Sequence, residues 1–82
     1  MKWQPMKYEF KYRLSQKSSF AQVIKAARAC NFNMTVYWNR IHFSSNEDGN
    51  YFGSDISLED VPEWLNLQLE DRELLKPLEP EP

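Results

Sequence analysis

The sequence predicts an α+β fold: a small antiparallel sheet of three to four strands with two helices on one face, in the order β-α-β-β-β-α. Three observations support this prediction. Apolar residues alternate strictly over Met6–Leu14, apolar residues recur at helical spacing over 20–30 and again after Ser57, and strand-favouring residues fill the stretch between them. The length of 82 residues suits one domain. We place it at residues 1–75 and expect residues 76–82 to form a mobile, acidic, Pro-rich tail.

The first strand is predicted over Met6–Leu14, because a period of two is typical of a strand with one buried face. A slip of one residue would expose the whole apolar set. We therefore expect Tyr8, Phe10 and Tyr12 to be largely buried. The alternate residues should lie on the open face of the sheet, and these are Lys7, Glu9, Lys11 and Arg13.

The first helix is predicted from Phe20 to Cys30. Ser19 and Gln22 have the spacing of a capping box, in which each side chain bonds the backbone of the other residue. Apolar residues then recur at the spacing of one helix face. Asn31 is suited to the left-handed conformation that commonly ends a helix.

A hairpin is predicted over Met34–Ser45, with Asn39-Arg40 as a two-residue turn. In this register the facing pairs on the core side are Trp38 with Ile41 and Val36 with Phe43. The open side would carry Thr35, Tyr37, His42 and Ser44. A second turn at 46–49 contains Asp-Gly and would lead into a short last strand over Asn50–Gly53.

A second helix is predicted to begin at Ser57 or at Pro62, because proline fits only a first turn. Its apolar stripe consists of Leu58, Val61, Leu65 and Leu69. Two readings of its end stay open. If the helix continues well beyond this stripe, Leu67 and Leu74 are exposed and mark a partner site. If it ends near Asp71, the leucines that fold back onto the core are Leu74, Leu75 and Leu78.

Charge is divided between the two halves of the chain. Residues 1–40 carry eight Lys and Arg against one acid, a net of +7, and residues 41–82 carry eleven acids against two bases, a net of −9. This asymmetry indicates charged partners more clearly than the overall net charge of −2 does. The single cysteine excludes an intramolecular disulfide, and no apolar run is long enough for a membrane span. We expect a cytoplasmic protein without membrane contact.

No set of residues with catalytic spacing is found. His42 is the only histidine, and Ser44 on the same strand is the one nucleophile type beside it, so a surface histidine is favoured. One Cys and one His are too few for structural zinc. The acids between Glu47 and Asp60 lack the spacing of a calcium loop, and phosphate-binding glycine loops are missing. We expect a protein that is not an enzyme and holds no metal or cofactor.

Residues 20–72 are predicted to follow the element order α-β-β-β-α, which resembles that of double-stranded-RNA-binding domains. The resemblance is one of element order. Domains of that family place Lys residues at the start of the last helix to hold phosphate. Here the segment from Ser57 to Glu63 reads SLEDVPE and is acidic, which argues against binding of duplex RNA in that mode.

The predicted function is that of a small non-enzymatic module that binds a protein partner and occludes part of its surface. Tyr, Trp and Arg are common interface anchors. In size and composition the chain is similar to small phage-encoded inhibitors of host defence, such as anti-CRISPR proteins, which implies the cytoplasm of a host cell. The candidate contact residues are Lys7, Lys11, Arg13, Tyr37, Arg40, His42, Glu59, Asp60, Glu63, Leu67 and Leu74.

The alternative function is that of a small nucleic-acid-binding regulator that uses a basic, open sheet face. Lys7, Lys11 and Arg13 would contact phosphate, and Tyr37 would stack on a base. A homodimer is a further arrangement that the sequence leaves open.

Overall fold

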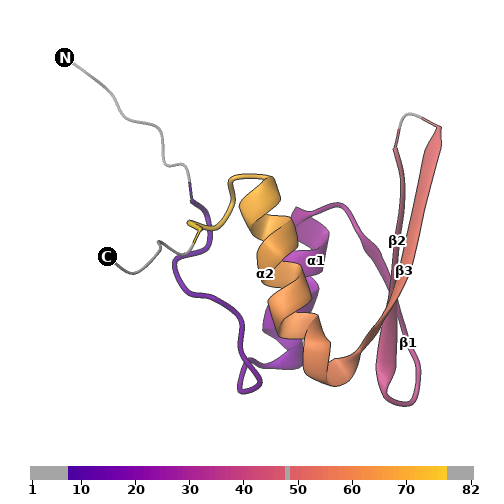
Figure 1. Cartoon of the computed structure of the whole chain (residues 1–82), viewed down its shortest axis with the longest axis horizontal. Helices are drawn as coiled ribbons and strands as arrows, with labels where there is room; N and C mark the ends of the chain where they lie inside the picture. Colours follow the sequence, from indigo (N-terminus) through magenta and orange to yellow (C-terminus); the bar gives the residue numbers. More distant parts are fainter. Residues whose placement is uncertain (1–7, 48, 78–82) are drawn as a thin grey trace.

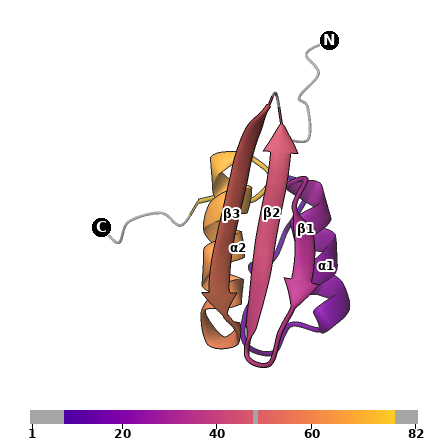
Figure 2. The same cartoon turned by 90° about the vertical axis from the view of Figure 1, so that its right-hand side faces the viewer.

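The computed structural model describes residues 8–47 and 49–77. Its elements are α1 (Phe20–Ala29), β1 (Asn33–Val36), β2 (Arg40–Glu47), β3 (Asn50–Ser57), the short 3-10 helix η1 (Leu58–Asp60) and α2 (Val61–Asp71). The strands form one antiparallel sheet in the order β1-β2-β3. Both helices lie on the same face of this sheet (Figure 1), and β1 and β3 are its two edges (Figure 2). The α+β class is confirmed.

Helix α1 begins and ends as the sequence predicts. The Ser19 hydroxyl accepts a hydrogen bond from the Gln22 amide at 3.2 Å, and the Gln22 side chain accepts one from the Ser19 amide at 2.9 Å. Asn31 has a φ of 64°, and the amides of Asn31 and Phe32 bond back to carbonyls of the last turn. This Schellman arrangement directs Phe32 into the core, where it is buried.

The hairpin between β1 and β2 is displaced by two residues from the predicted register. The facing pairs are Met34 with Phe43 and Val36 with Ile41. The Tyr37 amide donates to the Arg40 carbonyl at 2.8 Å, which leaves Trp38 and Asn39 as the loop. A shift of two keeps the paired side chains on their predicted faces, because faces alternate with a period of two. The prediction for Trp38 is wrong, since this residue leaves the core face and is 99% exposed.

Strand β3 is longer than the strand predicted over Asn50–Gly53. It continues because Ile56 still faces the core side, opposite Ile41 of β2. In the turn between β2 and β3, Gly49 has a φ of 76°, which glycine adopts without strain. Asp48, the other residue of the predicted Asp-Gly turn, lies outside the described residues.

The core lies between the sheet and the two helices. Its largest fully buried side chains are Ile41, Phe43, Leu65, Leu69 and Leu75. An aromatic stack fills the space between the sheet and α2, and its members are Phe32, Phe43, Phe52 and Trp64. The ring centroids of Phe43 and Trp64 are 4.7 Å apart. Full burial of one such side chain stabilises a fold by about 1.5–3 kcal/mol, so this stack is a main source of stability.

The chain folds back at the end of α2. The helix ends at Asp71, Glu73 has a φ of 60°, and the amides of Glu73 and Leu74 bond back to carbonyls of the last turn. This is the same Schellman end as that of α1. Leu74 then packs against the core and Leu75 is buried, so the fold-back alternative is the one that the structure shows. Leu78 lies outside the described residues.

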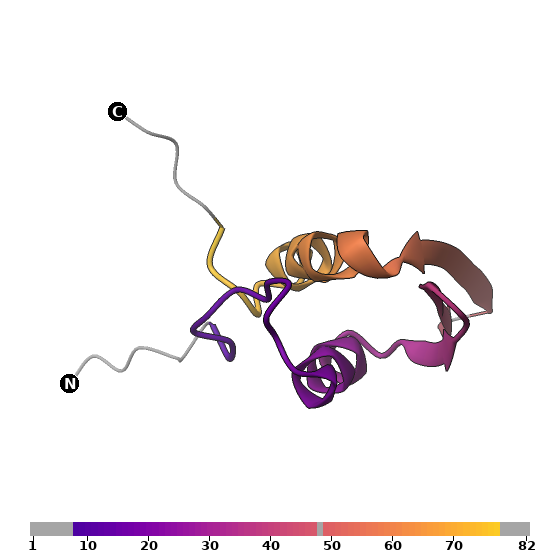
Figure 3. The ribbon, with the colours of Figure 1, turned by 90° about the horizontal axis from the view of Figure 1, so that it is seen from below.

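The prediction of a strand over Met6–Leu14 is wrong for its described part. Residues 8–14, which we call the N-terminal segment, run along the side of the helices that faces away from the sheet (Figures 1 and 3). Only an isolated bridge forms there, between Phe10 and Leu75. Tyr12, expected in the core, is 85% exposed. Residues 6 and 7 lie outside the described part.

Side-chain and backbone groups near α2 take the place of a neighbouring strand. Asn66, itself buried, accepts a hydrogen bond from the Leu14 amide at 2.9 Å and donates to the Leu14 carbonyl at 3.0 Å. The Leu74 carbonyl accepts a hydrogen bond from the Phe10 amide at 2.9 Å. These bonds pair the Phe10 amide and both backbone groups of Leu14, so the side chains of these two residues can pack on the helices without joining the sheet.

Candidate partner-binding surface

Three connections meet at one end of the molecule: the turn before α1, the β1–β2 loop, and the passage from β3 through η1 into α2 (Figures 1 and 2). The Leu58 amide donates to the Asn39 carbonyl at 2.9 Å. The Gln16 side chain donates to the Glu59 carbonyl. These hydrogen bonds fix the three connections relative to one another. We call residues 15–20, 36–40 and 57–60 the loop end.

Large apolar side chains are exposed at the loop end. Beside the fully exposed Trp38, the side chains of Phe20 and Val36 are 51% and 52% exposed, and Tyr37 and Leu58 also face solvent. Phe20 lines one hollow together with Leu58 and a second hollow together with Val36. Burial of these side chains would stabilise the domain, so folding does not explain their exposure. Apolar groups gathered at one end of a domain are typical of an interaction site.

Charged side chains of both signs lie at the same end of the molecule. Four of the predicted contact residues are exposed at or directly beside the loop end, and they are Arg40, Glu59, Asp60 and Glu63. Arg40 follows the β1–β2 loop, and the acids lie in η1 and in the first turn of α2. Exposed apolar groups together with charged groups are the usual composition of a protein interface.

His42 lies on the open face of the sheet, where Asp55 is its cross-strand neighbour. His42 Nδ1 is 2.7 Å from Asp55 Oδ1, and His42 Nε2 is 3.4 Å from the Tyr51 hydroxyl. The Tyr51 ring lies over Gly53, because a Cβ at Gly53 would come within 2.7 Å of the Tyr51 hydroxyl oxygen. The two ring nitrogens therefore face a carboxylate and a phenol rather than the predicted neighbour, Ser44. His42 is thus engaged on the open sheet face, two residues beyond the loop end.

The predicted basic face of the sheet does not form among the described residues. The N-terminal segment lies on the far side of the helices, so Lys11 and Arg13 are separated from the open sheet face (Figure 3). Arg13 forms an ion pair with Glu70 and also donates to the Lys76 carbonyl at 3.1 Å. Its charge is therefore engaged within the domain. Lys7 lies outside the described residues.

The two leucines proposed as partner contacts have different environments. Leu67 is exposed on α2, as predicted. The prediction of an exposed Leu74 is wrong, because the helix stops three residues earlier and the chain folds back onto the core. Of this pair, Leu67 alone remains available to a partner.

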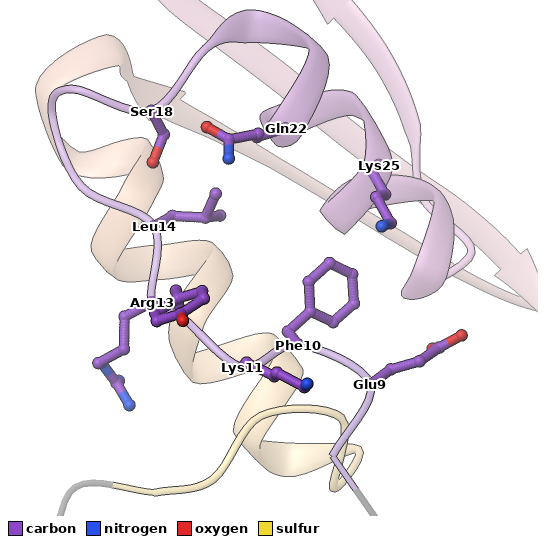
Figure 4. A pocket seen from close by; sticks show the side chains of 9 residues that line it. Glu9, Phe10, Lys11, Arg13, Leu14, Ser18, Gln22 and Lys25 are labelled. Carbon is purple, nitrogen blue, oxygen red and sulfur yellow. The ribbon is translucent and has the colours of Figure 1, made fainter.

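A groove of about 280 Å³ lies between the N-terminal segment and α1 (Figure 4). Phe10 and Leu14 point into it from the segment, and Gln22 and Lys25 border it from the helix. Lys25 Nζ lies 5.6 Å from the centroid of the Phe10 ring, a distance suited to a cation–π contact. Lys11, a predicted contact residue, lines this groove and not the loop end.

Cys30 is buried at the end of α1, as its position on the apolar stripe predicts. Burial raises the pKa of the Cys30 thiol, and the nearby Arg72 guanidinium offsets this only in part. A thiol that stays protonated is a poor nucleophile, so Cys30 acts as a core residue. Within residues 8–47 and 49–77, no three His, Cys, Asp or Glu side chains are placed to hold a metal. No helix of this part is long and apolar enough to cross a membrane.

Comparisons with known proteins find no family model, no curated protein and no solved structure that matches the chain. Function must therefore be inferred from the surface itself.

Strand alternation places Trp38 and Val36 on a core-facing stripe, and helical spacing does the same for Phe20. All three side chains are nevertheless exposed at the loop end. Registers that differ by two residues give the same faces, so the hairpin pattern cannot show whether Trp38 belongs to the strand or to the loop. The exposure of Phe20 and Val36 follows from their position at an edge, which periodicity does not encode.

Proposed function

We propose that the chain is a small protein-binding module that occludes part of its partner's surface, and that the loop end is its contact. The observation that carries this proposal is the full exposure of Trp38 between Tyr37 and Arg40. Tryptophan, tyrosine and arginine are the residues that most often dominate interface energies. The loop is held by hydrogen bonds of Tyr37 and Asn39, so little conformational entropy is lost when it binds.

Occlusion is proposed because the anchor protrudes. A fully exposed indole at the tip of a hairpin suits a concavity on the partner, and filling that concavity blocks it for other molecules. Arg40 and the acids of η1 would then choose the partner and raise the rate of association. The class of small phage-encoded host-defence inhibitors stays a prediction from size and composition.

The nucleic-acid alternative has weaker geometric support. It depends on a basic sheet face, and the described cations of that face, Lys11 and Arg13, lie on the other side of the helices. We therefore treat nucleic acid as an outcome of the test rather than as a second proposal.

The test compares Trp38→Ala with a matched control, Tyr12→Ala, in affinity purification followed by titration of the recovered partner. Tyr12 is also an exposed aromatic residue, but it lies in the N-terminal segment. We expect Trp38→Ala to weaken binding by at least about thirtyfold and Tyr12→Ala to leave it unchanged, with equal melting temperatures.

Retention of the partner by both variants would contradict the proposal. Recovery of a nucleic acid whose affinity falls linearly with salt in a log–log plot would support the alternative instead.

A further inference from the structure

Strand β1 presents unpaired backbone groups along its outer edge. Tyr37 and Arg40 face each other as a hydrogen-bonded pair, so the next pair, Val36 with Ile41, is a non-bonded one. Because bonded and non-bonded pairs alternate in an antiparallel ladder, Met34 and Val36 direct their N–H and C=O groups away from β2. Among the described residues, no turn, loop or side-chain hydrogen bond ends on these groups. An edge of this kind can accept a further strand.

A groove of about 370 Å³ lies between this edge and α1. Its apolar lining consists of Phe20, Ile24, Phe32, Met34 and Val36. Side chains alternate along a strand, so every second residue of an added strand would enter the groove. The other edge differs, because the stacked rings of Phe52 and Trp64 occupy the space between β3 and α2.

The charge that lines this groove is basic. It belongs to Arg28, and the α1 sequence FAQVIKAARA contains no acid that would offset it. An occupant with Asp or Glu residues gains from this field. A second copy paired edge to edge through β1 would bring two such helices together, and their like charges would repel. If the β3 edge of a second copy paired with β1, the resulting dimer would keep one free β1 edge and one free β3 edge. Further copies could then add without limit.

We infer that β1 and this groove bind an extended, acidic segment of the partner as a fourth strand of the sheet. Apolar residues at alternate positions of that segment would enter the groove, and its carboxylates would lie near Arg28. The groove reaches Phe20 and Val36, which also belong to the loop end, so the two surfaces are continuous. The inference rests on the proposed function and adds the chemistry of the partner segment.

The test is a titration of the full chain with a synthetic octapeptide of alternating Val and Glu, followed by amide hydrogen exchange. We expect slower exchange of the Met34 and Val36 amides as the peptide saturates the protein. The substitution Arg28→Glu should raise the Kd roughly fivefold. The matched control Lys11→Glu, which reverses an exposed cation of the N-terminal segment, should leave the Kd unchanged.

Two further peptides separate charge from backbone pairing. An octapeptide of alternating Val and Lys should bind more weakly. The Val-Glu peptide with an N-methyl group on every amide should give no protection, because no N–H group remains on either edge to extend the ladder.

The inference is overturned if a millimolar concentration of the Val-Glu peptide leaves the exchange of Met34 and Val36 unchanged. Protection of β3 amides instead would also overturn it. Protection without peptide that grows with protein concentration would assign the edge to a second copy. None of these outcomes bears on the proposed function, which fails only if Trp38→Ala keeps the cellular partner.

Discussion

The loop end and the N-terminal segment differ in what their side chains contact. At the loop end, Trp38 and Phe20 face solvent. Beside the N-terminal segment, the buried Asn66 is fully paired, and Arg13 has a charged partner in Glu70. The N-terminal segment therefore pairs its polar groups within the domain, whereas the loop end leaves apolar side chains free for the partner contact that we propose. Substitutions at the loop end should therefore cost less stability than substitutions of packed or paired residues.

The largest expected difference is between Trp64, which packs in the core, and Trp38 of the loop end. Trp64 lies in the aromatic stack, so Trp64→Ala should lower the free energy of unfolding by about 3–5 kcal/mol through loss of packing. Trp38→Ala should change it by less than about 0.5 kcal/mol, since the side chain is exposed. Urea unfolding followed by circular dichroism measures both. Equal losses for the two variants would break the comparison.

The next effect concerns Asn66. Asn66→Ala removes both hydrogen bonds to Leu14 and should cost about 1–3 kcal/mol, because two backbone groups lose their partner. Asn66→Asp keeps an acceptor for the Leu14 amide but sets a buried carboxylate oxygen against the Leu14 carbonyl, so it should cost at least as much as Asn66→Ala. The same unfolding measurement applies, together with hydrogen exchange of the Leu14 amide. Unchanged exchange at Leu14 in Asn66→Ala would show that the segment is held by other contacts.

The ion pair of Arg13 with Glu70 should have a smaller effect. Both side chains are partly shielded from water, so Arg13→Ala should cost up to about 1 kcal/mol, with part of this loss vanishing at high salt. The exchange of both charges, Arg13→Glu with Glu70→Arg, should recover some of the stability. Lys11→Ala serves as the control cation. A cost for Lys11→Ala equal to that for Arg13→Ala would indicate that net charge, and not the pair, is responsible.

The smallest effect is a gain in stability. Glu73 has a φ of 60°, where glycine is unstrained, so Glu73→Gly should raise the free energy of unfolding by about 0.5–1 kcal/mol. Asn31→Gly, at the matching position of α1, should gain less because asparagine tolerates this conformation. Thermal unfolding of both variants tests whether Glu73→Gly gains more stability than Asn31→Gly. Destabilisation by Glu73→Gly would mean that the Glu73 side chain makes a contribution larger than its backbone strain.

Local signals in the sequence predicted the elements better than their assembly. The capping box of Ser19 with Gln22 and the left-handed Asn31 depend on neighbouring residues, and both predictions are confirmed. The N-terminal segment shows the opposite case. Its period of two predicts that one side of the segment is apolar. The period does not specify whether the sheet or the helices cover that side. The bond that decides the matter joins Leu14 to Asn66, 52 residues away.

The polar residues of the candidate surface were predictable from the sequence, and its exposed apolar residues were not. Composition and charge pointed to Tyr37, Arg40 and the acids of η1, which the fold gathers at one end. Trp38 and Phe20 were assigned to core stripes, because apolar character is the only property that periodicity uses. Exposure at a loop or an edge is decided by register and by sheet order. Both depend on contacts that are distant in the chain.

The way in which the N-terminal segment is held has a consequence for the order of events on the ribosome. Contacts of residues 13–16 reach across 43 to 57 positions, to Glu59, Asn66 and Glu70. These residues are therefore synthesised well before their partners, whereas the two hairpins join near neighbours. Closing such large loops is slow compared with local pairing. Pairing within each hairpin can thus precede the long-range contacts, and the stretch that emerges earlier docks only after α2 has emerged.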